Sequence, residues 1–261
     1  MQRDVGHLAE MTWEEARAAA GAGAVALVPM GSLEQHGPHL PVRVDTALVT
    51  EVAAAAVHRL PEGVRVVLAP TLWLGASHHH LPFFAVSVQE RTYVEVVVQI
   101  GCSLADAGFR RLFFLNGHGG NAAPLRLAVN EIARARPAAL PACAEYWALG
   151  APGIRAARTT GPGGAAHACE VETSLMLHLA PAEVRRDRLR PEVPELPPAF
   201  VRDLVDGGPV ALGIAWERLS TGGVLGDPTQ ATPAKGAEML AACAAGVAET
   251  LAAFAELEVR S

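Results

Sequence analysis

A chain of 261 residues with 51% apolar and 18% charged residues can build a hydrophobic core, which excludes a disordered protein. Its net charge of −6 and the lack of a basic stripe argue against nucleic acid as a partner. The four cysteines form no CxxC pair, the N-terminus lacks an apolar signal core, and no long uncharged apolar run suggests a membrane span, so we expect a cytoplasmic protein with reduced thiols.

The first half of the chain alternates between helix and strand signals, in the order helix 12–21, strand 25–28, helix 46–60, strand 64–68, helix 89–107 and strand 111–115. The second half predicts a helix at 124–135, a strand at 139–146, a helix at 167–179 and a final helix from Pro233 to about Leu257. The segments 150–166 and 185–209 are expected to be irregular, apart from a short turn near 200–205. No linker divides the chain, which predicts a single domain over residues 1–261.

The predicted strands are continuously apolar rather than alternating. Strands of this kind, separated by helices, are typical of a parallel sheet covered on both faces. In such sheets the functional sites lie beyond the carboxyl ends of the strands. Three polar loops fall at such ends, 31–45, 70–87 and 116–121, and we expect the site where they meet.

The first of these loops carries Glu34, His36 and Asp45. Side chains alternate along an extended segment, so Glu34 and His36 can point the same way. Asp45 lies just before a predicted helix, and the glycine and prolines between them can bring it back toward the pair. Carboxylate and imidazole donors together favour a divalent cation such as zinc, manganese or iron.

His118 lies among glycines directly after a strand, where a ligand can approach closely. No Gly-Lys-Ser/Thr ending or GxGxxG motif accompanies it, which disfavours a phosphate-binding loop. His167 is a candidate general acid or base. Glu172 lies on an otherwise apolar helix and needs a partner, but spacing alone does not separate it from Glu170.

The loop 70–87 contains three consecutive histidines, His78, His79 and His80. Three neighbours in an extended loop cannot all face one point, so we expect one of them, His80, near the site. Trp73, Trp147 and Trp216 either stack on a flat substrate or pack in the core and loops.

Four sequence blocks together resemble the creatininase family of metal-dependent amidohydrolases, and the resemblance covers nearly the whole chain. The blocks are Gly31–Pro41 followed by Asp45, Asn116–Asn121, His167–Ser174 and Gly226–Thr229. The resemblance implies an α/β/α sandwich with a mostly parallel central sheet, a site for two divalent metal ions, and often a homohexamer.

Carried over by position, Glu34, His36, Asp45 and His118 match metal ligands of the family, with Asp45 bridging, and His167 matches the catalytic histidine. Creatininase itself has a glutamate two residues after the motif histidine, where this chain has Gly120. Glu172 matches the ligand that replaces it in other branches. Cys169 stands where the family usually has glycine, so its role stays open.

The resemblance therefore predicts a hydrolase that uses two divalent metal ions, zinc being preferred over manganese or iron, on a non-peptide C–N bond of a small molecule. The Gly120 departure argues against creatinine itself. One alternative is a peptidase that releases a short C-terminal fragment in the maturation of a mycofactocin-type redox cofactor. Another is a non-catalytic metal-binding member of the family, against which His167 and the intact ligand set argue.

Overall fold

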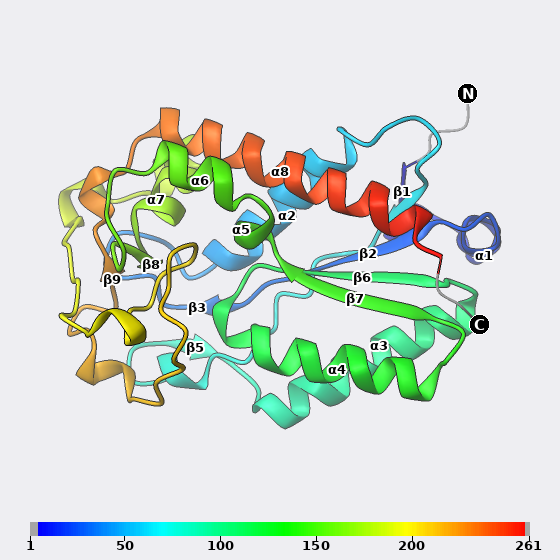
Figure 1. Ribbon diagram of the computed structural model, residues 1–261, viewed down its shortest axis with the longest axis horizontal. Helices are drawn as coiled ribbons and strands as arrows, with labels where there is room; N and C mark the ends of the chain where they lie inside the picture. The colour runs from blue at the N-terminus through cyan, green and yellow to red at the C-terminus, as the bar shows by residue number, and fades with distance from the viewer. Residues whose placement is uncertain (1–4, 259–261) are drawn as a thin grey trace.

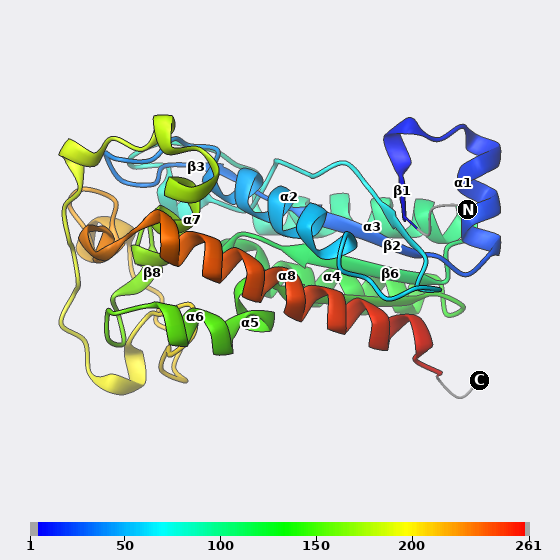
Figure 2. The same cartoon turned by 90° about the horizontal axis from the view of Figure 1, so that it is seen from above.

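The structure is a computed structural model that describes residues 5–258 (Figure 1). Residues 1–4, which entered the expectation that no signal segment opens the chain, lie outside the described residues, as do residues 259–261. The chain folds around a central five-stranded sheet with helices on both sides (Figures 1 and 2). This confirms the predicted α/β architecture.

The strands of the central sheet are all parallel to their neighbours. Their order across the sheet is β1 (Val5–His7), β4 (Val66–Leu68), β2 (Val25–Met30), β6 (Arg111–Asn116) and β7 (Leu140–Glu145). The central pair, β2 and β6, is buried almost throughout, which explains why its sequence is continuously apolar.

Side chains that alternate along the strands build two separate cores. Leu27 and Phe113 point to one face and Val28 and Phe114 to the other. The first face is covered by α2 (Val44–Val57), α5 (Tyr146–Leu149), α6 (Ala151–Ala157), α7 (Glu170–Leu179) and α8 (Pro233–Glu256). The second is covered by α3 (Glu90–Ala107) and α4 (Ala122–Ala135), with α1 (Trp13–Gly21) at its end.

Local signals set several helix ends. Thr12 and Glu15 form a reciprocal capping box that starts α1. α3 ends at Gly108, whose φ of 113° favours glycine. Pro233 is the first residue of α8, and the Thr232 hydroxyl accepts a hydrogen bond from the Lys235 amide.

α8 is long and apolar enough, by length and composition, to cross a membrane, with a mean hydropathy of 1.4 over its most apolar window. Met239, Cys243, Val247 and Leu251 of this helix are fully buried in the first core. α8 packs against α2, α6 and α7. Helices of a protein core make such contacts, so the apolar composition of α8 is explained by its packing in this domain.

The structure corrects three local predictions. The segment 150–166, expected to be irregular, contains α6, whose Pro152 lies in the first turn where proline is tolerated. His167 does not begin a helix: it ends the short strand β8 (Ala165–His167), and α7 starts at Glu170. The second strand begins at Val66 rather than at residue 64.

Two short antiparallel pairs that the sequence did not predict lie together at one end of the molecule (Figure 1). β3 (Leu33–Glu34) pairs with β5 (Ala85–Val86), and β8 pairs with β9 (Leu225–Gly226). They fix the backbone on either side of Glu34 and His167.

Candidate metal centre

Strand register brings the three polar loops to one place. Met30 at the end of β2 lies opposite Asn116 at the end of β6, and Met30 also forms a parallel bridge with Leu72. The loops that follow these residues therefore leave the same edge of the sheet side by side. This is the edge at which parallel sheets place their sites.

Glu34 and His118 meet at this edge. His118 Nε2 lies 3.2 Å from Glu34 Oε2, and both side chains are buried. The other ring nitrogen, Nδ1, lies 3.0 Å from Asp45 Oδ2. Residues from the strand β3, the loop after β6 and the helix α2 thus share a single cluster.

Asp45 reaches the cluster because α2 starts very close to the end of β2. A Cβ added at Gly31 would lie 2.7 Å from Thr46 Cα, so a side chain at position 31 would push the helix away. Asp45 then stands in the first turn of α2, where a carboxylate also suits the helix dipole. Its second oxygen, Oδ1, lies 3.1 Å from His36 Nε2. One carboxylate therefore faces two imidazoles from opposite sides.

Glu172 joins the cluster on the His36 side. Its Oε1 lies 3.7 Å from His36 Nε2. Glu170 points elsewhere: its buried carboxylate accepts hydrogen bonds from Thr159 and Thr160 and pairs with Lys235. The structure thereby separates the two glutamates that spacing alone could not.

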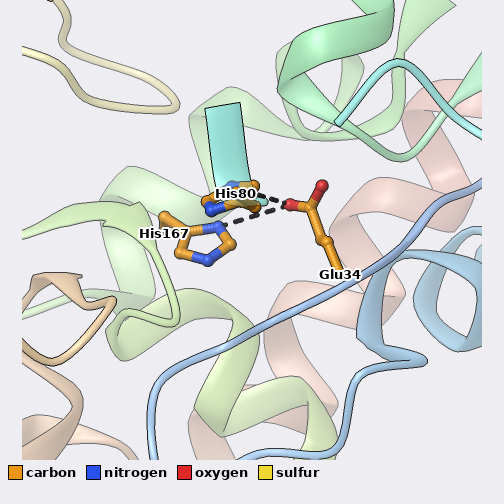
Figure 3. Close-up of side chains that lie close together, drawn as sticks. All are labelled: Glu34, His80 and His167. Atoms are coloured by element: carbon orange, nitrogen blue, oxygen red, sulfur yellow. Dashed lines mark ion pairs between the residues drawn. The ribbon is translucent and has the colours of Figure 1, made fainter. Parts of the chain in front are cut away.

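His80 and His167 both face one carboxylate oxygen of Glu34 (Figure 3). Glu34 Oε1 lies 3.1 Å from His80 Nε2 and 3.8 Å from His167 Nδ1. His167 Nε2 lies 2.8 Å from the carbonyl oxygen of Gln35, which can only accept, and 3.1 Å from the Gln35 side-chain nitrogen, which can only donate. The shorter contact favours a proton on Nε2 and leaves Nδ1 as the accepting nitrogen.

His78 and His79 have different surroundings, as expected for three consecutive histidines. His78 Nδ1 lies 2.9 Å from the Ser87 hydroxyl, away from the cluster. The His79 ring stacks on His118 at 5.7 Å, and burial, followed by nearby cationic groups, lowers its pKa to about 3. Trp216 packs edge-on against His80 at 4.2 Å, whereas Trp73 is half exposed.

Two polar residues of the site were not singled out in the sequence. The Gln35 side chain contacts the rings of both His80 and His167, and Ser77 Oγ lies 3.1 Å from His118 Nε2. The only available signal for Gln35 is its place between Glu34 and His36. Ser77 precedes the three histidines and gives no such signal.

The donor atoms of the cluster fit divalent cations. Four buried atoms of the cluster have no hydrogen-bond partner among the described residues: Glu34 Oε1, His36 Nε2, Asp45 Oδ2 and His80 Nε2. Their neighbours lie 3.0–3.1 Å away without hydrogen-bond alignment. Two ligands of one zinc ion lie roughly 3.3 Å apart, because each is about 2.0–2.1 Å from the metal. Glu34, His36 and Asp45 also present ligand atoms within 4.8 Å of one another.

Electrostatics couple these groups strongly. Burial alone would lower the pKa of His118, but Glu34 and Asp45 raise it to about 10. Burial likewise opposes charge on His36, yet Asp45 and Glu172 hold its pKa well above the usual value. In contrast, burial and the neighbouring His36 and His80 keep the pKa of His167 well below its usual value. The carboxylates therefore favour positive charge between them, while His167 stays neutral.

A cavity of about 520 Å³ opens onto the cluster. Glu34, Asp45, His118, His167 and Glu172 all line it. His36 lies behind them and is fully buried. The cavity is large enough for a small molecule or the end of a peptide.

Position 120 cannot carry a side chain in this site. A Cβ on Gly120 would lie 2.5 Å from His118 Nε2 and 2.8 Å from His79 Cε1, and closer still to the Ala76 carbonyl oxygen. The stacked rings of His79 and His118 take up the space in which a glutamate at this position would start. Cys169 Sγ lies 3.8 Å from Glu172 Oε2, beside the carboxylate on the other side of the cluster.

The fold and the site thus define an α/β protein with a metal-binding cluster at the carboxyl edge of its sheet. The sequence profile described as creatinine amidohydrolase matches residues 9–251, and the chain belongs to the creatininase family of hydrolases. This confirms the resemblance seen in the four sequence blocks.

Three named proteins illustrate the similarity. A mycofactocin precursor peptide peptidase of Mycobacterium tuberculosis is 38% identical over 83% of this chain and 80% of its own length. A creatinine amidohydrolase of Pseudomonas putida is 35% identical over 42% of this chain and 43% of its own. A crystal structure of creatinine amidohydrolase (creatininase) superposes with a TM-score of 0.78 and 26% identity, covering 99% of this chain and 100% of that one.

Proposed function

We propose that this chain is a metal-dependent peptidase that cleaves an amide bond in a short precursor peptide. The main support for a metal-dependent hydrolytic site is the set of buried donor atoms without hydrogen-bond partners beside the cavity. The peptide substrate is supported by the similarity to mycofactocin precursor peptide peptidases, which extends over more than four fifths of the chain. Gly120 supports it as well, since the glutamate of creatininase has no room there.

The residues that would hold two divalent cations are Glu34, His36, Asp45, His118 and Glu172, of which Asp45 faces both His36 and His118. Zinc is our first choice and manganese or iron the alternatives, because the donors are carboxylates and imidazoles. Solved creatininase structures described as a "Zn-Zn type" mutant and as "Creatininase Mn" support zinc and manganese, respectively. When bound, such cations supply an activated water and polarise an amide carbonyl.

His167 is the proposed proton carrier. Because its Nε2–H is held by the Gln35 carbonyl, Nδ1 is the basic nitrogen of the ring. A neutral His167 first takes a proton from the water and then gives it to the leaving nitrogen. Gln35 holds the ring in the tautomer that this exchange needs.

A second candidate is the non-peptide hydrolase that the four sequence blocks favour. Cleavage of a small amide is supported by the similarity over part of the chain to creatinine amidohydrolase. The similarity to a 3-dehydro-scyllo-inosose hydrolase of Thermotoga maritima, 32% identical over 46% of this chain, supports a small-molecule substrate only, because an inosose contains no nitrogen. The cavity volume suits a small cyclic amide as well as a peptide end.

A substrate panel separates the two candidates. Protein stripped of metal and reloaded with zinc, manganese or iron is incubated with short peptides, creatinine, other cyclic amides and formamides, and products are identified by mass spectrometry. Cleavage of peptides alone supports the peptidase. Cleavage of the small amides alone supports the second candidate, and activity that survives without metal contradicts both.

We also propose a single-domain, cytoplasmic homo-oligomer, with a hexamer as the expected state. Trp73, Leu81 and Phe84 are each about half exposed within one short segment, and such side chains are suited to a contact between copies. Light scattering at several protein concentrations tests the assembly. A particle that keeps the mass of one chain contradicts it.

A further inference from the structure

One charged side chain of the cavity wall takes no part in the cluster described above. Arg202 is half-buried and lines the same cavity as Glu34 and His167. Among the described residues that line this cavity, it is the only lysine or arginine. It belongs to the segment 185–209, for which the sequence predicted irregular structure apart from a short turn near 200–205.

The position of Arg202 is fixed from two sides. Its Nη2 donates a hydrogen bond of 2.7 Å to the Leu212 carbonyl, and its guanidinium lies 5.8 Å from the centre of the Trp216 ring. The side chain of the next residue, Asp203, is fully buried, pairs with Arg158 at 2.7 Å and accepts a hydrogen bond from the Gly163 amide. The backbone that carries Arg202 is therefore well anchored.

Arg202 nevertheless lacks a counter-charge. No carboxylate lies within 4 Å of its guanidinium in the part of the chain that the structure describes, whereas Arg43, Arg136, Arg155 and Arg158 each pair with one. Burial also lowers the pKa of Arg202, because the charged form loses water. A partly buried guanidinium with free donors is costly unless an anion joins it.

The surroundings of Arg202 suit an apolar group next to that anion. Val210, Leu212 and Ile214 also line the cavity, and Leu212 contacts Arg202 directly. Trp216 contacts both His80 and Arg202: the centre of the His80 ring lies 4.2 Å from the indole, and the Arg202 guanidinium lies 5.8 Å from it. Through their shared contact with Trp216, His80 and the Arg202 guanidinium lie no more than about 10 Å apart, a distance that about three residues of extended chain can span.

We propose that Arg202 binds a carboxylate of the substrate, which is therefore an amide bearing a carboxylate and an apolar group a few residues from the cleaved bond. The inference rests on the proposed function, since it names a feature of that enzyme's substrate. Guanidinium donors bind a carboxylate through two parallel hydrogen bonds, and only one N–H of Arg202 is used by Leu212. A free C-terminus and an acidic side chain both supply this chemistry.

Binding measurements on the full-length, metal-loaded protein test the inference by calorimetry. One probe pair is acetyl-glycyl-phenylalanine and its C-terminal amide. The other is acetyl-glutamyl-phenylalanine amide and acetyl-glutaminyl-phenylalanine amide. Each pair differs only in one carboxylate, so the pair that shows a preference identifies its source.

Arg202→Met removes the charge, and Arg218→Met is the matched control. Arg218 is exposed in the adjacent turn Trp216–Arg218 and does not line the cavity. We expect the wild type and Arg218→Met to bind the carboxylate member of one pair about tenfold or more tightly than the amide. Arg202→Met loses this preference while its affinity for the amide is unchanged.

Three results overturn the inference. The wild type shows no preference within either pair, or Arg202→Met keeps the preference, in which case the bound cations rather than Arg202 attract the carboxylate. The third is an equal loss of affinity for both members, which indicates a structural role. The substrate panel tests the proposed function separately. If the protein cleaves amides but binds no carboxylate preferentially, only the Arg202 site is rejected. If it binds the carboxylate preferentially but cleaves no amide, only the proposed function is rejected.

Discussion

His118 Nε2 lies 3.2 Å from Glu34 Oε2, although the two residues follow different strands of the sheet. The distance results from the pairing of β2 with β6, which brings the loop after each strand to the same edge. A shared centre requires this contact, and Asp45 and His36 extend it on the far side. Four predictions test how the residues around this contact divide their roles.

Asp45→Asn keeps the shape of the side chain but removes its charge between His36 and His118. We expect loss of bound metal and a fall in activity of more than about 100-fold, since even outer-shell partners of a metal contribute 10–100-fold. Metal content per chain and circular dichroism measure binding and fold. Asp106→Asn, which breaks an exposed pair with Arg136, is the control and retains both metal and activity.

Glu172→Gln and Glu170→Gln are expected to have opposite effects. Glu172→Gln loses metal with little change in stability, because its carboxylate faces His36. Glu170→Gln keeps metal but lowers the free energy of unfolding by about 1.5–3 kcal/mol, since it weakens the hydrogen bonds that Lys235 and Thr160 donate to this side chain. Urea unfolding and metal analysis of both variants check this. The reverse pattern contradicts the assignment of Glu172.

His80→Gln is expected to lower activity by about 10–100-fold, because the His80 ring lies against Glu34 and His167 and holds both in place. His78→Gln is the matched control, since His78 contacts Ser87 outside the cluster. Steady-state rates on the peptide identified by the panel compare the two. Equal losses of activity in both variants would show that His80 and His78 only stabilise the loop that carries them.

Gly120→Ala is expected to destabilise the protein by about 1–3 kcal/mol and to weaken metal binding, because its Cβ collides with His118 and the Ala76 carbonyl. Gly119→Ala introduces the same group where nothing lies within 4 Å, and we expect it to leave both properties unchanged. Thermal unfolding with and without chelator measures the difference. A stable, metal-binding Gly120→Ala variant rules out the steric account of this position.

Much of the fold could be predicted because local chemistry and tertiary packing agree. Thr12 and Glu15 start α1 as their spacing indicates, and the apolar runs of β2 and β6 form the buried centre of a parallel sheet. Short strands were harder to predict. β3 and β8 have only two and three residues, and their partners are distant in sequence, so periodicity gives them no signal.

The site shows the same division. Glu34, His36, Asp45 and His118 could be singled out because they follow strands of one sheet edge. Glu170 and Glu172 could not be separated, since residues two apart on a helix lie on different faces, and only tertiary packing decides which face meets the cluster. Arg202 comes from an irregular segment whose path depends on contacts such as Asp203 with Arg158.

The central claim is that the cluster holds two divalent cations on which hydrolysis depends, and elemental analysis of freshly purified protein tests it most directly. We predict about two equivalents of zinc, manganese or iron per chain, with activity lost on chelation and restored by the same metal. Protein that contains no divalent metal and still cleaves its substrate in the presence of chelator would contradict the account.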